Sequence, residues 1–329
     1  MCDGGRAPEG AGTLPGGLDS WPQVDEHSGF MTRTIDPADV AARFREEIRT
    51  QLDEARGPLR LLGVLAGDHG PSRTYASYAE RACADLGVGF ELRHVERLLA
   101  EHAIREANAD PDVHGVIVYY PVFGSGHDVY LRELVDPAKD VEGMHSTWAR
   151  ALYENRRYVD AAGTKKAILP CTPLAVLKLV EAAGSFRPSG LPLAGRTVTL
   201  FNRSEVVGRP LASMMANDGA HVYSFDVDGP MLFDPPAASD DAHGVRETGI
   251  TRARALAESD IVVTGVPSRQ FPLVAGAEIR AGALCINFST FRNFADDIAG
   301  VAGTFIPRVG PMTVLMVIRN ALRLRENAR

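Results

Sequence analysis

The residues with the clearest chemical use lie in Thr199–Gly229, where a strand, a polar turn, a helix and a second strand follow one another. The turn, NRSEVVGRP (202–210), stands where a nucleotide pyrophosphate meets the N–H groups of a helix start. Asn202 takes the place of the first glycine in the pattern G-x-G-x-x-G, and the small Ser204 takes that of the second. Gly208 lies in the first helical turn. The stretch therefore predicts a dinucleotide-binding loop with an altered sequence.

The second strand of this unit ends on Asp226, about 20 residues past the loop. A carboxylate at this position accepts hydrogen bonds from the hydroxyls of an adenosine ribose and repels a 2′-phosphate. It therefore predicts NAD rather than NADP as the cofactor, with Arg203 adding positive charge beside the phosphates. Asp228 is close enough to share or replace this role, and an ordinary strand-end aspartate is the alternative.

The elements that precede this unit alternate between helices and strands. An amphipathic helix is predicted over 35–57, with Asp36 or Asp39 near its start. Strands over 59–67, 90–95 and 113–122 alternate with helices over 72–87 and 98–110. This alternation predicts a parallel sheet covered on both faces.

The second half of the chain shows the same alternation around the nucleotide loop. Strands are predicted over 196–202, 220–226, 261–267 and 283–289, helices over 208–219 and 251–260, and a long loop over 227–248. This is the pattern of a doubly wound nucleotide-binding unit. A last helix over 312–327 follows the unit, and we expect its apolar face to pack against the first domain.

Composition and charge exclude several classes of protein. The length of 329 residues favours two domains. A formal net charge of -7 and a pI near 5.7 argue against broad binding to nucleic acid or to a membrane surface. No apolar run approaches the roughly 20 residues that span a bilayer. Residues 1–29 are rich in glycine, proline and acidic residues, and they are predicted to form a disordered tail.

The four cysteines are Cys2, Cys83, Cys171 and Cys285. No two of them have the C-x-x-C spacing, which argues against a structural zinc site and against a disulfide framework. We therefore expect no metal and a reducing, cytoplasmic location.

Four sequence blocks together resemble one enzyme family. They are DPAKDVEGMH (136–145), ILPCTPLAV (168–176), NRSEVVGRPLA (202–212) and VGPMTVLM (309–316), and they occur in the order and spacing of the methylenetetrahydrofolate dehydrogenase/cyclohydrolase family. The chain is most similar to the NAD-dependent, monofunctional dehydrogenase branch known from yeast. The resemblance covers roughly 36–324.

The resemblance implies a fold and a reaction. It implies an α/β protein with a folate-binding catalytic domain (30–183), a Rossmann-type NAD-binding domain (184–307) and a C-terminal helix (308–329) that returns to the first domain. The reaction would transfer a hydride from the one-carbon bridge of 5,10-methylenetetrahydrofolate to NAD. The resemblance also implies a homodimer built through the nucleotide domain.

The family's site residues can be carried over to matching positions. On the substrate side Tyr75 would pack against the folate ring system, and Glu142 would hydrogen-bond the pterin edge, which presents paired N–H donors. Tyr119 and Pro311 would complete the substrate site. Cys171 would lie near the nicotinamide, and its alternative role is that of a small buried apolar residue. Tyr75, Glu142 and Cys171 are thus the candidate catalytic residues, and the cofactor-binding candidates are Asn202, Arg203, Ser204, Val207, Gly208, Asp226, Gly265 and Thr313.

Two departures from the family pattern concern the cyclohydrolase reaction. Bifunctional members carry a lysine where this chain has Ala79, and a glutamine where it has Tyr119. Because alanine has no donor, acceptor or charge, we expect no cyclohydrolase activity. One alternative is a bifunctional enzyme in which another group, with Lys139 the nearest candidate, replaces the lysine. A non-catalytic protein that binds NAD or folate is the other alternative.

Overall fold

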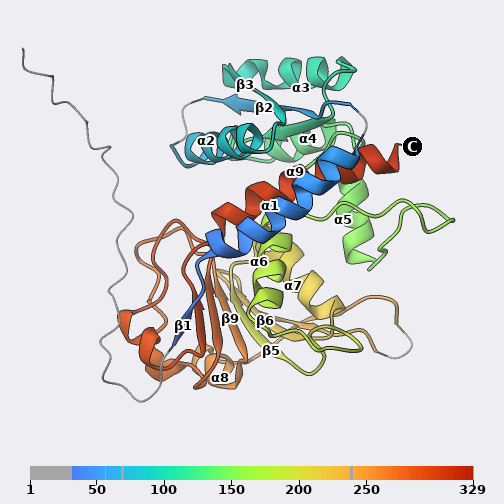
Figure 1. Ribbon diagram of the computed structural model, residues 1–329. Coiled ribbons are helices and arrows are strands. Elements are labelled where there is room, and N and C mark those ends of the chain that lie inside the picture. The colour runs from blue at the N-terminus through green and yellow to red at the C-terminus, as the bar shows by residue number, and fades with distance from the viewer. Residues whose placement is uncertain (1–31, 56, 68–69, 238–239, 329) are drawn as a thin grey trace, which may run out of the picture.

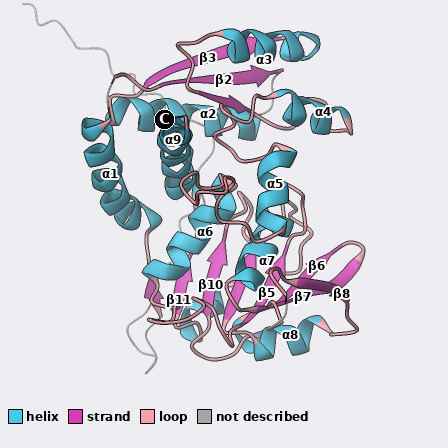
Figure 2. Ribbon diagram, turned by 90° about the vertical axis from the view of Figure 1, so that its right-hand side faces the viewer, coloured by secondary structure: helices cyan, strands magenta, loops and turns pink. Residues whose placement is uncertain are grey.

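The computed structural model describes residues 32–55, 57–67, 70–237 and 240–328. Within these residues the chain forms two lobes, one with a three-stranded sheet and the other with an eight-stranded sheet (Figure 1). Helices α1 (Pro37–Glu54), α6 (Cys171–Ala182) and α9 (Gly310–Asn327) lie between the two sheets (Figures 1 and 2). The predicted α/β class with two sheets is confirmed. The tail predicted over 1–29 lies outside the described residues.

The smaller sheet has the strand order β3-β2-β4, and its pairings are parallel. Strand β2 is buried from its second residue onward because helices cover both of its faces. Strand β4 is shorter than predicted and ends at Val118, so Tyr119 and Tyr120 lie beyond the strand. The elements of this lobe are β2 (Arg60–Ala66), α2 (Gly70–Asp85), β3 (Gly89–Val95), α3 (Ala100–Ala109), β4 (Gly115–Val118), α4 (His127–Leu134) and α5 (Ser146–Tyr153).

The larger sheet has the strand order β1-β11-β10-β9-β5-β6-β7-β8. Its strands from β1 to β6 are parallel neighbours, as expected for a doubly wound sheet. Strand β1 precedes α1 in the chain, yet it pairs with β11 at the edge of this sheet. The elements are β1 (Arg33–Thr34), β5 (Thr197–Phe201), α7 (Gly208–Asn217), β6 (His221–Asp226), β7 (Gly229–Asp234), β8 (Gly244–Glu247), α8 (Arg252–Glu258), β9 (Ile261–Thr264), β10 (Leu284–Asn287) and β11 (Thr304–Ile306).

The segment predicted as a long loop over 227–248 contains two strands, so that prediction was wrong. Strand β7 pairs antiparallel with β6, and β8 pairs antiparallel with β7. All four residues of β8 are exposed, and the strand therefore lacks the apolar alternation that marks a half-buried strand. The two strands extend the parallel sheet at the side of Asp226.

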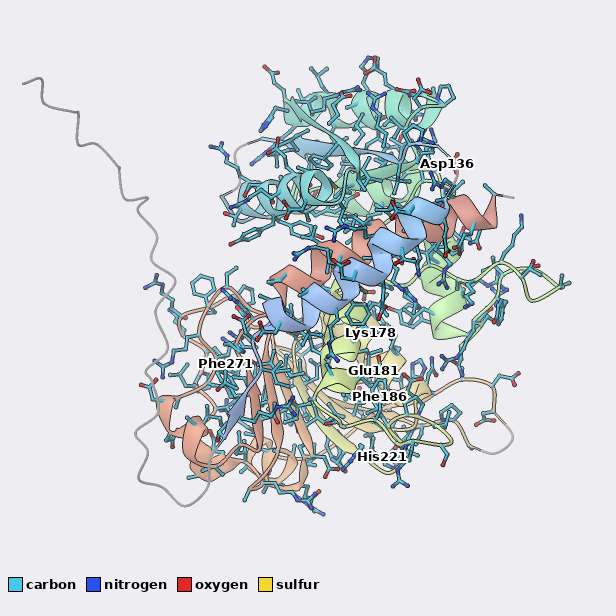
Figure 3. All side chains as sticks on the ribbon, in the orientation of Figure 1. Asp136, Lys178, Glu181, Phe186, His221 and Phe271 are labelled. Carbon is cyan, nitrogen blue, oxygen red and sulfur yellow. The ribbon has the colours of Figure 1, made fainter. Side chains whose placement is uncertain are left out.

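The helices between the lobes pack against one another. Asp36 caps α1 by accepting a hydrogen bond from the Ala38 N–H at 2.9 Å, and Pro37 occupies the first turn. The face of α1 that carries Ile48 packs against α9, as predicted for the last helix. On α6, Lys178 lies 5.7 Å from the Phe44 ring centre of α1 and pairs with Glu181 at 2.8 Å (Figure 3). Within the described residues no helix is long and apolar enough to cross a membrane.

Candidate active site

The loop between β5 and α7 is organised by its own side chains. The amide of Asn202 donates to the Gly265 carbonyl oxygen at 2.9 Å, and the amide oxygen accepts from the Ser204 hydroxyl at 2.8 Å. The Ser204 oxygen in turn accepts from the N–H groups of Val207 and Gly208, at 3.2 and 3.4 Å. These hydrogen bonds bring together five predicted cofactor residues where β5 and β9 end: Asn202, Ser204, Val207, Gly208 and Gly265.

Two glycines allow a close approach of neighbouring groups, a backbone carbonyl at Gly208 and an aromatic ring at Gly265. A methyl group on Gly208 would overlap the carbonyl of Asn202, and one on Gly265 would overlap the ring of Phe288. In dinucleotide-binding loops a glycine at the helix start permits the same tight contact between helix and strand. The loop therefore fits a dinucleotide even though Asn202 and Ser204 replace the other glycines.

The carboxylate of Asp226 lies at the end of β6, beside this loop. One oxygen accepts from the backbone N–H of Arg203 at 2.6 Å, and the other accepts from the backbone N–H of Val227 at 2.8 Å. The residue is exposed, so its remaining lone pairs face solvent. This position suits a carboxylate that accepts hydrogen bonds from ribose hydroxyls.

The side chain of Arg203 points toward the turn between β6 and β7. Its guanidinium donates to the carbonyl oxygens of Ser224 and Gly229 at 2.9 and 3.0 Å, and it forms an ion pair with Asp228. The side chain is 11% exposed, and its donors are therefore occupied by the turn. Asp228 is paired with this guanidinium, whereas the Asp226 oxygens accept only from backbone N–H groups, which favours Asp226 as the carboxylate for a ribose. The hairpin that binds Arg203 was missed in the sequence, so this arrangement was not expected.

On the substrate side, Tyr75 of α2 and Tyr119 beyond β4 form an edge-to-face pair. Their ring centres lie 5.7 Å apart with an angle of 80° between the planes. Both hydroxyl groups are buried, and neither has a hydrogen-bond partner within the described residues. Burial raises the pKa of both phenols, and the nearby carboxylate of Glu142 raises it further. Tyr75 is half-buried, so part of the residue is accessible although its hydroxyl is buried.

Glu142 is a buried carboxyl group, with 7% of its surface exposed. Burial raises its pKa from 4.5 to about 8, and the neighbouring Asp140 adds to the shift. Asp140 accepts hydrogen bonds from the N–H groups of Glu142, Gly143 and His145, at 3.1, 3.0 and 2.7 Å. These bonds fix the turn that carries Glu142. At neutral pH the carboxyl group is therefore mostly protonated in the free protein.

Cys171 begins α6 and lies next to the same turn. Its thiol donates to the Val141 carbonyl oxygen at 3.2 Å, and burial raises its pKa well above the ordinary value. The amide of Asn320 on α9 donates to the carbonyl oxygens of Val141 and Leu169, at 2.9 and 2.8 Å, and to the Cys171 sulfur at 3.4 Å. Cys171 is therefore a protonated thiol that helps to hold the backbone beside Glu142.

Asn320 was not predicted as a site residue. The only signal in the sequence is a polar amide within the apolar helix 312–327, where a buried amide needs partners.

The predicted site residues of α9 lie in its first turns. Pro311 is half-buried, and the buried Thr313 hydroxyl donates to the Val309 carbonyl oxygen at 3.4 Å. Their contacts with substrate and cofactor stay predictions.

Neither Ala79 nor Lys139, the candidate to replace the missing lysine, offers a free catalytic group. Ala79 is 1% exposed. The Lys139 ammonium donates to the carbonyl oxygens of Ala107, Asn108 and Asp110 at 3.0, 2.8 and 2.6 Å, so it fastens a loop and is not free for catalysis. Within the described part of the chain, no three His, Cys, Asp or Glu side chains are arranged to hold a metal ion.

Comparisons with known proteins agree with this geometry. Residues 35–142 match the family model described as "Tetrahydrofolate dehydrogenase/cyclohydrolase, catalytic domain". The chain is 39% identical to the methylenetetrahydrofolate dehydrogenase [NAD(+)] of Schizosaccharomyces pombe over 290 residues, which is 87% of this chain and 90% of that protein. It is also 39% identical to the Saccharomyces cerevisiae protein of the same name over 310 residues, 90% of this chain and 96% of that one.

The solved structures give the same result. The NAD-dependent 5,10-methylenetetrahydrofolate dehydrogenase of Saccharomyces cerevisiae superposes with a TM-score of 0.84 at 38% identity, and the match covers 91% of this chain and 98% of that chain. A Trypanosoma brucei dehydrogenase-cyclohydrolase, at 23% identity and a TM-score of 0.72, shares the fold. Because relatives this similar extend over most of both chains, the protein belongs to the tetrahydrofolate dehydrogenase/cyclohydrolase family.

Proposed function

We propose that this protein oxidises 5,10-methylenetetrahydrofolate to 5,10-methenyltetrahydrofolate with NAD as the hydride acceptor. One observation carries the proposal. Candidate residues from separate segments lie together: the Cys171 thiol donates to the Val141 carbonyl oxygen, next to Glu142, at 3.2 Å, and Tyr75 packs edge-to-face on Tyr119 at 5.7 Å between ring centres. The loop of Asn202 and Gly208 provides the dinucleotide site. The relatives with NAD-dependent names support the same reading.

The protein's own residues would bind and orient the two ligands. The aromatic ring of Tyr75, which is half-buried, would pack against the pterin or the adjoining ring. Glu142 can donate one hydrogen bond while protonated, and it can accept from paired N–H groups when they are bound against it. When bound, NAD supplies the hydride-accepting chemistry, so the rate depends mostly on how well these residues position the substrate.

The same residues support a dehydrogenase without cyclohydrolase activity. Hydrolysis of the methenyl product requires a base that activates a water molecule. Ala79 has no such group, and Tyr119 is a buried phenol with a raised pKa, so it holds its proton at neutral pH. Lys139 is occupied by three carbonyl oxygens. We therefore expect the methenyl product to accumulate.

An absorbance assay tests both parts of the proposal. With 5,10-methylenetetrahydrofolate and NAD, we expect NADH and methenyltetrahydrofolate to form in equal amounts. Methenyltetrahydrofolate is then added to the enzyme without cofactor, and its decay is compared with a buffer blank. Absence of NADH formation would refute the dehydrogenase assignment. Decay that increases in proportion to the enzyme would refute the loss of cyclohydrolase activity.

We also propose a homodimer that forms through strand β8. This strand is an edge of the larger sheet, and an exposed edge can pair with a second copy. Sedimentation equilibrium should show a dimer, and Val245→Lys on β8 should shift it toward the monomer. Val227→Lys is the matched control, because Val227 is fully exposed but lies in the turn before β7. An unchanged dimer in Val245→Lys would contradict the proposed interface.

The proposed location is the cytoplasm. Cys83, Cys171 and Cys285 are free, buried thiols, which suits a reducing compartment. Fractionation of cells that express the full chain tests this, and recovery of the protein from an oxidising compartment would contradict it.

A further inference from the structure

Asn320, a buried amide on α9, connects the segments that meet beside Glu142. The residue is 1% exposed. Its side-chain nitrogen donates to the carbonyl oxygens of Val141 and Leu169 at 2.9 and 2.8 Å, and it lies 3.4 Å from the Cys171 sulfur. An amide nitrogen carries two N–H donors, and the two carbonyl oxygens are its two shorter contacts. Asn320 therefore holds the backbone directly before Glu142 and directly before the start of α6.

The turn that carries Glu142 packs on the segment before α6 through backbone atoms. Gly143 has a φ of +67°, and a methyl group on it would come within 2.9 Å of the Leu169 carbonyl carbon. Only glycine permits this approach, because it has no side chain to separate the two segments. Since Asn320 donates to both segments, it sets where the pair lies relative to α9.

The shape of this turn and its place in the protein have different supports. The Asp140 carboxylate accepts from three N–H groups within the turn and so fixes its shape. The start of the turn is held by β4, where the Val116 N–H donates to the Lys139 carbonyl oxygen at 2.8 Å. Asn320 supplies the support on the side of α9. The position of the Glu142 carboxyl group therefore depends on this amide.

The same face of α9 also carries a predicted cofactor contact. Thr313 and Asn320 are seven positions apart, about two helical turns, so their side chains lie on one face of the helix. Both residues are buried. Helix α9 lies beside α6 between the two sheets (Figures 1 and 2). One rigid helix thus connects the predicted cofactor contact with the support of Glu142.

We propose that Asn320 is a positioning residue for the folate, which acts by holding Glu142 where the N–H groups of the substrate meet it. The proposal rests on the proposed function, because it takes Glu142 as the group that binds the pterin edge. Asn320 acts through the turn and not by touching the ligand, since its donors are taken by two carbonyl oxygens. Without the amide the turn can shift, and a misplacement of about 1 Å can lower a reaction rate about a hundredfold.

Steady-state kinetics of Asn320→Leu and Asn217→Leu test the proposal. Leucine has the same number and branching of side-chain heavy atoms as asparagine but no donor. Asn217, at the end of α7, is the matched control, because it is a buried amide that donates to the Leu152 carbonyl oxygen at 3.2 Å and is not among the candidate site residues.

The two variants should differ in their KM values. Asn320→Leu should raise the folate KM and lower kcat, so that kcat/KM for the folate falls about ten- to a hundredfold while the KM for NAD stays within about twofold of the wild type. A purely structural defect lowers the amount of folded enzyme, which reduces the apparent kcat and leaves both KM values unchanged. Asn217→Leu should show at most this second pattern.

Circular dichroism shows whether each variant folds. Asn320→Ser is smaller and retains one donor, so it keeps the test valid if Asn320→Leu does not fold, and it should lose about three- to tenfold in kcat/KM for the folate. The proposal is overturned if the folded Asn320 variants retain the wild-type folate KM, or if their KM for NAD rises as much. An equal rise of the folate KM in Asn217→Leu would overturn it too.

Titration calorimetry with tetrahydrofolate separates this proposal from the proposed function. A wild type that forms no NADH but binds tetrahydrofolate refutes only the dehydrogenase assignment, and Asn320→Leu should still weaken that binding about tenfold. Unchanged tetrahydrofolate binding in folded Asn320→Leu overturns the positioning role. Failure of the wild type to bind tetrahydrofolate overturns both.

Discussion

Replacement of Glu142 by glutamine is expected to remove a pH dependence from the stability of the protein. Glutamine preserves the shape of the side chain but does not ionise. In the native wild type the carboxyl group retains its proton up to a pH of about 8, whereas in the unfolded chain it loses the proton near 4.5. Between these values the native state binds more protons than the unfolded state. The free energy of unfolding therefore falls as the pH rises through this window.

The size of the effect follows from the two pKa values. Their difference corresponds to roughly 5 kcal/mol, of which roughly 3–4 kcal/mol is lost between about pH 5 and pH 8. This contribution is fully present below about pH 4.5 and stops changing above about pH 8. The variant should therefore gain roughly 3–4 kcal/mol relative to the wild type over that interval. The direct contribution of Asp140 is common to both proteins and largely cancels in the comparison.

Urea unfolding without ligands, followed by circular dichroism at several pH values, measures this difference. Glu80→Gln on the exposed side of α2 is the matched control and should follow the wild type. If the wild type and Glu142→Gln lose stability in parallel from about pH 5 to about pH 8, Glu142 does not hold its proton in the native state and the reasoning fails.

Three further changes concern the ligands. Asp226→Ser should relax the preference for NAD over NADP, which we expect to exceed about tenfold in kcat/KM for the wild type, and equal wild-type values for both cofactors would contradict this. Tyr75→Ala should weaken folate binding by about 1–3 kcal/mol and leave NAD binding nearly unchanged, whereas an equal loss in both titrations would mark a structural residue. Gly208→Ala should sharply weaken NAD binding, because its methyl group would overlap the Asn202 carbonyl, and an unchanged NAD dissociation constant would show that the loop can shift.

The nucleotide loop could be predicted because its signals are local. A buried strand, a polar turn, Gly208 and a strand that ends on Asp226 follow one another within about 30 residues, the length of a βαβ unit. The hairpin of β7 and β8 was missed because β8 is exposed along its whole length and stabilised by pairing with β7. The position of the Arg203 guanidinium depends on that hairpin and was missed for the same reason.

The environment of Glu142 could be predicted only in part. Its place in the block 136–145 identified it as a site residue, but its raised pKa results from burial in the folded protein and from the neighbouring Asp140. The contacts of Asn320 with Val141 and Leu169 join residues separated by 179 and 151 positions. Such tertiary contacts leave no pattern in a single sequence.

The pairing of β1 with β11 constrains how the chain can fold during synthesis. The Thr32 hydroxyl donates to the Ala302 carbonyl oxygen, and these residues are 270 positions apart. Strand β1 and the face of α1 that meets α9 must therefore wait until nearly the whole chain has left the ribosome. Until then the apolar side of α1 and the edge of β10 are open to other chains. Nascent polypeptides of this protein should depend on chaperones until translation ends, and premature termination before β11 should yield aggregates rather than a functional fragment.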